Sequence, residues 1–195
     1  MTTATSDGRV LRGERNRTAI VDALLALLAE GESRPSARLV AERAGVSLRS
    51  VFQHFDDMES LYAACVERQL GRVAQLVTPI EPQLPLDTRV AAIVDQRVRL
   101  FEQVAPIRRA ALLAAPASPV LRAGLRRSSD ELRDQVAKVF APELTTRGRE
   151  VLDALDVACS FDAWDHLSRT RGLRAAAVRR AMTRLVRGAL GEGSP

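Results

Sequence analysis

Aliphatic side chains recur at spacings of three and four residues in almost every segment between the prolines and glycines of this chain. That spacing gathers them on one face of an α-helix, and no segment keeps the alternation of apolar and polar residues that is typical of a strand. Aromatic residues make up only 4% of the chain, so leucine, valine and alanine must fill the core. The sequence therefore predicts an all-α protein of about nine helices.

Prolines and glycines mark where the predicted helices end. Pro106 is expected to separate two helices, because a proline inside a helix removes a backbone hydrogen bond and clashes with the preceding turn. A break is also expected near Gly148, and Asp56 with Glu59 has the spacing of a capping box. The predicted helices cover residues 14–30, two short stretches within 36–55, 57–77, 86–103, 107–115, 120–140, 143–170 and 174–190.

Three prolines between residues 79 and 85 form the clearest boundary between two domains. The polar composition of the two chain ends favours flexible segments there. The predicted division is a flexible arm over 1–12, a small three-helix domain over 13–68, a larger helical domain over 69–190 and a flexible tail over 191–195.

The segment Ser36–Phe55, SARLVAERAGVSLRSVFQHF, has the pattern of two short helices joined by a tight turn. Gly45 stands where the backbone must reverse, a position that favours positive φ. Ser36 and Ser47 are suited to cap the two helices. Apolar side chains expected to face the shared core are Val40, Ala44, Val46 and Val51. The second helix is short enough to enter a major groove by its N-terminal end, so the segment predicts a DNA-binding helix-turn-helix.

The order Ala-Glu-x-Ala-Gly-Val-Ser-x-x-x-Val-Phe-x-His-Phe, followed by an acidic helix start, resembles the TetR family of bacterial repressors. The resemblance extends over residues 14–67. It implies an all-helical homodimer with the DNA-binding domain over 13–68 and an effector-binding and dimerisation domain over 69–190. It also implies a palindromic double-stranded DNA operator, which the protein releases when it binds a small-molecule effector.

Position by position, the resemblance implies which side chains contact bases or phosphates. These are Ser36, Arg38, Ser47, Leu48, Arg49, Ser50, Phe52 and His54. Arg49 is the best placed to bind guanine through both arms of its guanidinium. The chain departs from the family pattern where Phe52 replaces a tyrosine and Met58 replaces a lysine, and both changes remove an expected phosphate contact. Arginines of the N-terminal arm that are candidates to compensate are Arg9, Arg12, Arg15 and Arg17.

The distribution of charge gives little support to DNA binding by itself. The net charge is +5, but residues 1–68 carry nine arginines and ten acidic residues, whereas the remainder carries twenty basic and fourteen acidic residues. The basic surplus therefore lies outside the segment expected to bind DNA. A few well-placed arginines, and not a broad basic surface, must make the contacts.

The larger domain has weaker signals. Apolar candidates for an effector pocket, each of which also fits an ordinary core position, are Phe101, Val104, Leu112, Leu113, Phe140, Phe161 and Trp164. With few aromatic residues and no obvious buried charge, an apolar effector is expected. Residues 150–168 and 175–190 of two copies are expected to form a four-helix bundle. Its predicted interface residues are Leu155, Cys159, Val178, Met182, Leu185, Val186 and Ala189. The last helix is also basic and amphipathic, as in membrane-binding helices, but it lacks an aromatic anchor.

Other classes of function have little support. The two cysteines are far apart and fit buried apolar positions, so no disulfide, metal or other cofactor is expected. Neither a signal peptide nor a membrane-spanning segment is evident, so a cytoplasmic location is expected. No paired carboxylates, glycine-rich phosphate loop or nucleophile elbow indicates an enzyme. The alternative is a helical ligand-binding or protein-interaction module with a weakened DNA-binding domain, which Phe52 and Met58 favour.

Overall fold

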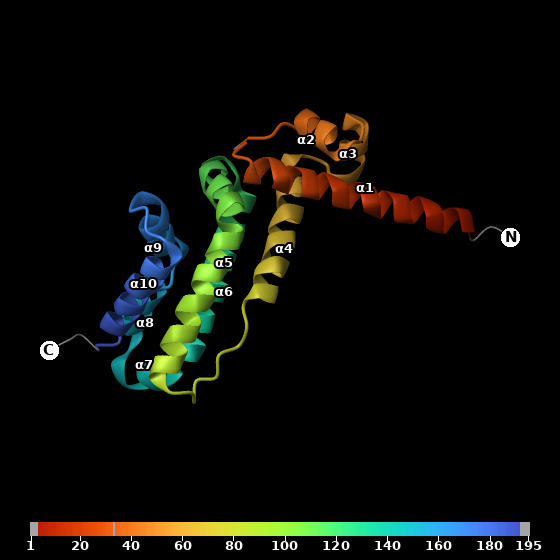
Figure 1. The fold of residues 1–195 in the computed structure, drawn as a ribbon. Helices are drawn as coiled ribbons and strands as arrows, with labels where there is room; N and C mark the ends of the chain where they lie inside the picture. The colour runs from red at the N-terminus through yellow and green to blue at the C-terminus, as the bar shows by residue number, and fades with distance from the viewer. Residues whose placement is uncertain (1–3, 33, 192–195) are drawn as a thin grey trace. The chain divides into compact units, whose positions relative to one another are not determined.

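The computed structural model describes residues 4–32 and 34–191, and every regular element in that part of the chain is a helix (Figure 1). The prediction of an all-α protein is confirmed. In chain order the elements are α1 (Ala4–Ala29), α2 (Ala37–Ala44), α3 (Leu48–His54), α4 (Met58–Leu76), α5 (Leu86–Ala114), the short 3₁₀ turn η1 (Ala115–Ala117), α6 (Pro119–Val139), α7 (Ala141–Arg147), α8 (Arg149–Ala158), α9 (Phe161–Asp165), the π-helical turn η2 (His166–Thr170) and α10 (Ala175–Ala189). None of the helices described is both long and apolar enough to cross a bilayer.

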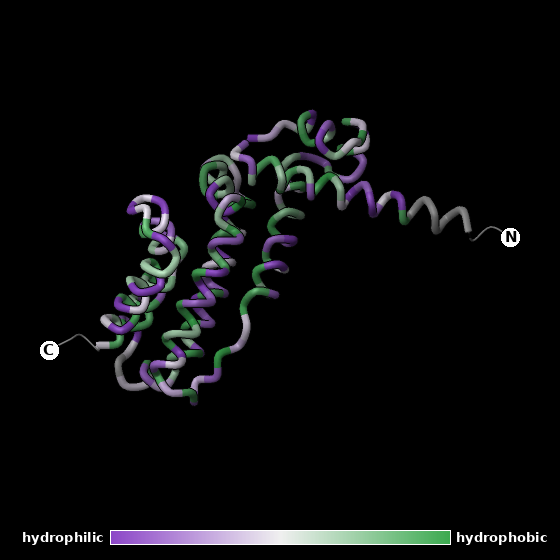
Figure 2. The backbone as a smooth tube through the Cα atoms, viewed as in Figure 1, coloured by the Kyte–Doolittle hydropathy of each residue, from purple (hydrophilic) through white to green (hydrophobic). Residues whose placement is uncertain are grey.

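The chain divides into two compact units, which we call the head and the body. The head comprises residues 1–71 and 106–125, and the body comprises residues 72–105 and 126–195. The sequence assigned 106–125 to the larger domain, whereas in the structure this stretch packs in the head. Hydropathy changes repeatedly along the helices, as expected when one face is buried and the other is solvated (Figure 2).

The head has its own hydrophobic core. Buried side chains of α1, the two short helices, α4, the end of α5 and the start of α6 form one cluster, including Ile20, Leu24, Val40, Val51, Leu61, Cys65, Ala110, Ala114 and Leu121. Gly124 of α6 approaches α4 so closely that an added Cβ atom would lie 2.6 and 2.7 Å from the two Cγ atoms of Val66. This contact explains why the start of α6 belongs to the head.

The predicted break at Pro106 is wrong, because α5 is continuous from Leu86 to Ala114. Pro106 is exposed, and so is Glu102, whose carbonyl loses its hydrogen bond to the missing N–H. Water can bind that carbonyl, and buried Ala105 and Ala110 hold the helix on both sides of the proline.

Several helix ends also differ from the prediction. The first helix begins at Ala4, not near residue 14, so most of the predicted flexible arm is helical. Of the predicted flexible tail, residues 192–195 lie outside the described residues. The expected helix over 143–170 is interrupted at Gly148, as anticipated, and again at Ser160, whose Oγ accepts a hydrogen bond from the Ala163 N–H at 3.1 Å.

The capping box of α4 lies one residue later than predicted. The Ser60 N–H donates to Asp57 Oδ1 at 2.8 Å, and the Asp57 N–H donates to Ser60 Oγ at 3.2 Å. Glu59, expected to complete the box with Asp56, instead accepts from Ser118 Oγ at 3.0 Å. Glu59 is therefore hydrogen-bonded to Ser118, far along the chain, and does not form the predicted local cap with Asp56.

The body packs α8, α9 and α10 with parts of α5 and α6. Its core contains three aromatic rings, Phe101, Phe161 and Trp164, with centroids 5.5 to 5.9 Å apart. The sequence showed no obvious buried charge in this domain, but the side chains of Arg89 (4% exposed) and Arg97 (0% exposed) lie within its core.

Candidate nucleic-acid interface

The turn between α2 and α3 has the geometry that its residues predict. Ser36 is extended, and its Oγ accepts from the Leu39 N–H at 3.2 Å at the start of α2. Gly45 ends that helix with φ 67° and ψ 29°, in the left-handed region where a side chain is disfavoured. Ser47 caps α3 by accepting from the Ser50 N–H at 3.1 Å. The two predicted caps and the glycine turn are therefore confirmed.

The two short helices are held on α1 by a continuous apolar contact. Val40, Ala41, Val51 and Phe55 are each at most 4% exposed and pack in the head core. Outside this core, Arg43 of α2 binds Glu30 through both arms of its guanidinium at 2.7 Å each. Since both helices are fixed on the same support, the exposed face of α3 has a defined orientation within the head.

That exposed face consists of residues one turn apart on α3. Leu48 is 43% exposed and Phe52 is 50% exposed, and Arg49 and Gln53 are exposed beside them. Among the described side chains no carboxylate pairs with Arg49. Apolar side chains and an unpaired arginine at the N-terminal end of a short helix are the types that contact thymine methyl groups and guanine edges in a major groove.

The other predicted contact residues lie around this face. Ser36, Arg38 and Ser47 are exposed, while Ser50 and His54 are half-buried. The Arg38 guanidinium already contacts the Glu42 carboxylate at 3.2 Å, in an exposed pair that a phosphate can replace at little cost. His54 lies against α1, since an added Cβ at Gly13 would be 3.8 Å from its Cε1 atom.

The N-terminal half of α1 supplies the additional arginines. Arg12, Arg15 and Arg17 are exposed. The Arg17 guanidinium lies 5.0 Å from the centre of the Phe55 ring, which places a positive charge beside the end of α3. The sequence predicted a flexible arm for part of this region, but within the described residues these cations are carried on a helix.

The predicted effector-pocket residues do not all lie in one unit. Phe101, Val104, Phe140, Phe161 and Trp164 are each at most 9% exposed in the body core. Leu112 and Leu113 belong to the head segment of α5 and are 41% and 68% exposed. The structure therefore groups five of the seven candidates and leaves the two leucines out of that group.

The predicted dimer residues divide in a similar way. Buried in the core of a single protomer are Leu155, Cys159, Val178, Met182 and Val186. Leu185 is 48% exposed, and Ala189 is half-buried. Helices α8 and α10 pack on each other within one chain, so the apolar stripe that sequence reasoning assigned to a partner is used inside the protomer.

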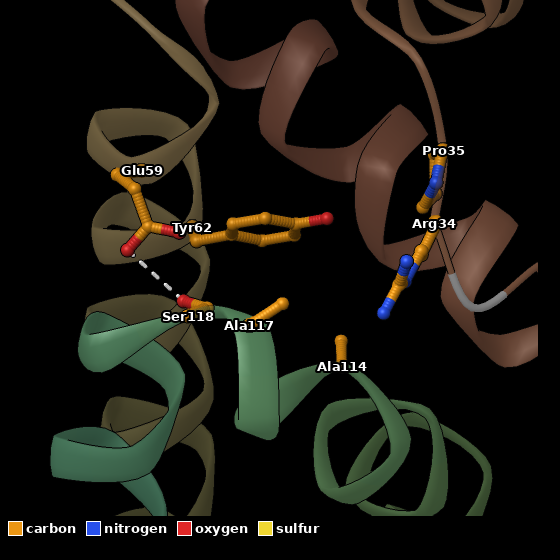
Figure 3. A pocket seen from close by; sticks show the side chains of 7 residues that line it. All are labelled: Arg34, Pro35, Glu59, Tyr62, Ala114, Ala117 and Ser118. Atoms are coloured by element: carbon orange, nitrogen blue, oxygen red, sulfur yellow. Dashed lines mark hydrogen bonds between the residues drawn. The ribbon is translucent and has the colours of Figure 1, made fainter.

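The head also contains a cavity of about 220 Å³. It is lined by Arg34, Pro35, Glu59, Tyr62, Ala114, Ala117 and Ser118. In Figure 3 the Tyr62 ring extends across the cavity toward Arg34, and Glu59 turns away to its hydrogen bond with Ser118. Burial raises the pKa of the Tyr62 hydroxyl, so the phenol stays neutral. Sequence reasoning missed this cavity because its lining comes from segments far apart in the chain.

Comparison with known proteins agrees with this geometry. Residues 20–65 match the family described as "Bacterial regulatory proteins, tetR family". No curated protein sequence matches the chain significantly.

Two solved structures share the fold over nearly the whole chain. One is described as a TetR-family transcriptional regulator from Mesorhizobium loti, with 18% identity and a TM-score of 0.66, covering 93% of this chain and 98% of its own. The other is a transcriptional regulator from a Rhodococcus species, with 21% identity and a TM-score of 0.64, covering 94% and 99%.

The fold and the exposed α3 define a helix-turn-helix protein with a helical body. The match over residues 20–65 agrees, for that segment, with the resemblance to the tetR family seen in the sequence, and the two solved structures share the fold of nearly the whole chain.

Proposed function

We propose that this chain is a non-enzymatic transcriptional repressor, which binds a palindromic DNA operator as a homodimer and leaves it when a small-molecule effector binds the body. The observation that carries the proposal is the exposed face of α3, a capped helix whose Arg49 has no carboxylate partner among the described side chains. The family match over residues 20–65 supports the same conclusion.

In the proposed complex, the N-terminal turn of α3 enters the major groove. Arg49 donates to the O6 and N7 atoms of a guanine, and Leu48 and Phe52 contact thymine methyl groups. Phe52 lacks the hydroxyl expected from the family, but its half-exposed ring keeps an apolar contact available. Ser36 and Ser47, at the starts of their helices, offer hydroxyl and amide hydrogen-bond donors to phosphates.

The proposed homodimer uses the exposed side of α8 and α10, which keeps Leu185 of the predicted interface residues and not the buried ones. The large apolar side chains left exposed there are Val157 (67%) and Leu185 (48%). Exposed apolar side chains on neighbouring helices favour association with a second copy. Because a two-fold dimer presents two α3 helices, it would bind two half-sites of opposite orientation.

Selection of bound sequences from random DNA, followed by a binding titration with Arg49→Ala, tests the proposal. A palindromic consensus is expected. The variant should lose about 1–3 kcal/mol of discrimination between consensus and random DNA, since a bidentate contact to guanine contributes that much. Arg180→Ala, an exposed arginine of α10 in the body, is the matched control and should bind as the parent does. Unchanged discrimination by Arg49→Ala would refute the assigned face.

The alternative is a helical ligand-binding or protein-interaction module whose head no longer binds DNA. Phe52 and Met58 favour it, because each removes a polar contact expected at a phosphate. A titration at low ionic strength separates the two functions, since phosphate contacts make DNA affinity fall steeply with salt. Absence of any salt-sensitive binding would favour the module.

A further inference from the structure

Arg97 of α5 is a charged side chain that is fully enclosed by the body. Its Nη1 donates to Gln135 Oε1 at 2.7 Å, and its Nη2 donates to the Leu132 carbonyl at 2.9 Å. Its Nε–H has no hydrogen-bond partner. No carboxylate lies within 4.0 Å of this guanidinium among the described residues, so its charge is met only by neutral oxygens.

Arg89, two turns earlier on the same helix, is a natural comparison. It is also buried, but it binds Glu143 through both arms at 2.6 and 2.8 Å and donates to two backbone carbonyls. The same core therefore contains one arginine with a carboxylate and one without. An isolated buried charge is strongly unfavourable, whereas a well-packed apolar side chain in its place is often neutral or stabilising.

The neutral partners of Arg97 are themselves fixed. Gln135 donates to Gln96 Oε1 at 2.7 Å, and Gln96 donates to the carbonyl and the hydroxyl of Thr78 at 2.9 and 2.8 Å. Rotation of these amides to supply another acceptor would break their own bonds. The Nε–H of Arg97 therefore cannot gain an acceptor from Gln135 or Gln96 unless these amides lose their present hydrogen bonds.

The surroundings of Arg97 include three packed aromatic rings. Phe101 lies one helical turn further on the same face of α5, in edge-to-face contact with Phe161 and close to Trp164. Desolvation by burial lowers the pKa of Arg97, and the Coulombic effects of Cys159 and Asp156 oppose that shift.

We propose that Arg97 is the anchor for the carboxylate of the effector, whose apolar part packs against Phe101, Phe161 and Trp164. The effector is thus an amphiphilic carboxylic acid, and not the purely apolar molecule expected from the sequence. A carboxylate oxygen would accept a hydrogen bond from the Nε–H, and its negative charge would balance the buried positive charge. Because Arg97 is wholly enclosed, the ligand reaches it only when the surrounding helices part, so binding is coupled to a change in the body.

Trp164, the only tryptophan of the chain, provides the readout. The full-length protein is titrated with straight-chain carboxylates from hexanoate to dodecanoate and with 3-phenylpropionate, each beside its primary amide, while Trp164 emission is followed. At least one carboxylate should bind saturably, and about tenfold or more tightly than its amide, as expected for a hydrogen bond to a charged group. No saturable carboxylate binding, or equal affinity for acid and amide, would overturn the proposal.

Variants test the residue itself. Arg97→Met should abolish the preference for acid over amide while leaving amide affinity unchanged, and Arg97→Gln is a second neutral replacement if the first does not fold. Arg99→Met, an exposed arginine on the same helix, is the matched control and should keep the preference. If Arg97→Met or Arg97→Gln still prefers the acid over the amide, the proposal is also overturned. The comparison of acid and amide in the parent protein tests the proposal even if neither variant folds.

The role as an effector depends on the proposed repressor function, and the DNA readout separates the two. The same carboxylates are added to the complex of the protein with its selected DNA. Carboxylate binding without DNA release would support the Arg97 site and refute the proposed release of DNA by the effector. DNA binding with no carboxylate binding would support the proposed DNA-binding function and refute the Arg97 site.

Discussion

Replacement of Gly124 by alanine tests the contact that joins α6 to α4 within the head. A Cβ atom at this position would lie 2.6 and 2.7 Å from the two Cγ atoms of Val66, against about 3.5–4.0 Å for an ordinary carbon contact. Valine cannot easily move aside, because it is branched at Cβ and rotation exchanges one methyl group for another. The overlap must be relieved by shifting the two helices.

Two opposing effects set the size of the change. Alanine is favoured over glycine in a helix interior by about 1 kcal/mol. Overpacking typically costs about 1–3 kcal/mol. The expected net result for Gly124→Ala is therefore destabilisation of the head by about 0–2 kcal/mol. Gly71→Ala in α4 isolates the first effect, since nothing lies within 4 Å of its Cβ position, and should stabilise by about 1 kcal/mol.

Urea unfolding of both variants measures the difference between them, which equals the cost of the overlap. We expect the two variants to differ by about 1–3 kcal/mol in free energy of unfolding. Val66→Ala removes both Cγ atoms, so Gly124→Ala should cost less in that background than in the parent. If Gly124→Ala is as stabilising as Gly71→Ala, the close approach of α6 to α4 is refuted.

Three further predictions concern the body and one exposed ion pair. Glu143→Gln should lower the free energy of unfolding by about 3 kcal/mol, because it leaves Arg89 buried without its counter-ion. Glu42→Gln, whose carboxylate is in an exposed ion pair, should change the free energy of unfolding by less than about 1 kcal/mol in the same urea titration. Burial raises the pKa of the Cys159 thiol to about 11, so above about pH 9 this thiol ionises in the unfolded chain only, and stability should fall with rising pH up to about 11. The fall in urea midpoint should be smaller in Cys159→Ala, and an equal fall would contradict the assignment. Leu185→Glu should yield a folded monomer by light scattering, and a persistent dimer would exclude this face.

Local signals were sufficient to predict the helix-turn-helix of α2 and α3. Ser36, Gly45 and Ser47 act through their own backbone and the next turn, so residue type and spacing determine the caps and the turn. The exposure of Leu48 and Arg49 follows from the same spacing, because the opposite face of α3 carries Val51. A short segment whose contacts lie within a few residues can be predicted without its tertiary surroundings.

Features that depend on distant segments could not be predicted in this way. The Glu59 carboxylate accepts a hydrogen bond from Ser118, just before α6, instead of completing the predicted local cap. Pro106 is tolerated because it faces solvent. The sequence predicted α8 and α10 as apolar on one side but could not distinguish contact with each other from contact with a partner. The burial of Arg97 had an overlooked signal, since it lies in the apolar stripe of α5 between Ile93 and Phe101.

Residues 1–68 are nearly neutral in total, and several arginines of the head are paired with carboxylates. Three of its acidic residues each bind an arginine: Glu30 binds Arg43, Asp22 binds Arg68, and Glu42 binds Arg38. Among the described side chains of the head, exposed arginines with no carboxylate partner on α1 and α3 are Arg12, Arg15, Arg17 and Arg49; Arg34 and Arg122 lie elsewhere in the head. A net charge adds paired and unpaired residues alike, so it conceals where free cations gather. Arg12, Arg15, Arg17 and Arg49 are thus unpaired cations that the total charge of residues 1–68 does not reveal, and they are available for the phosphate contacts of the proposed DNA complex.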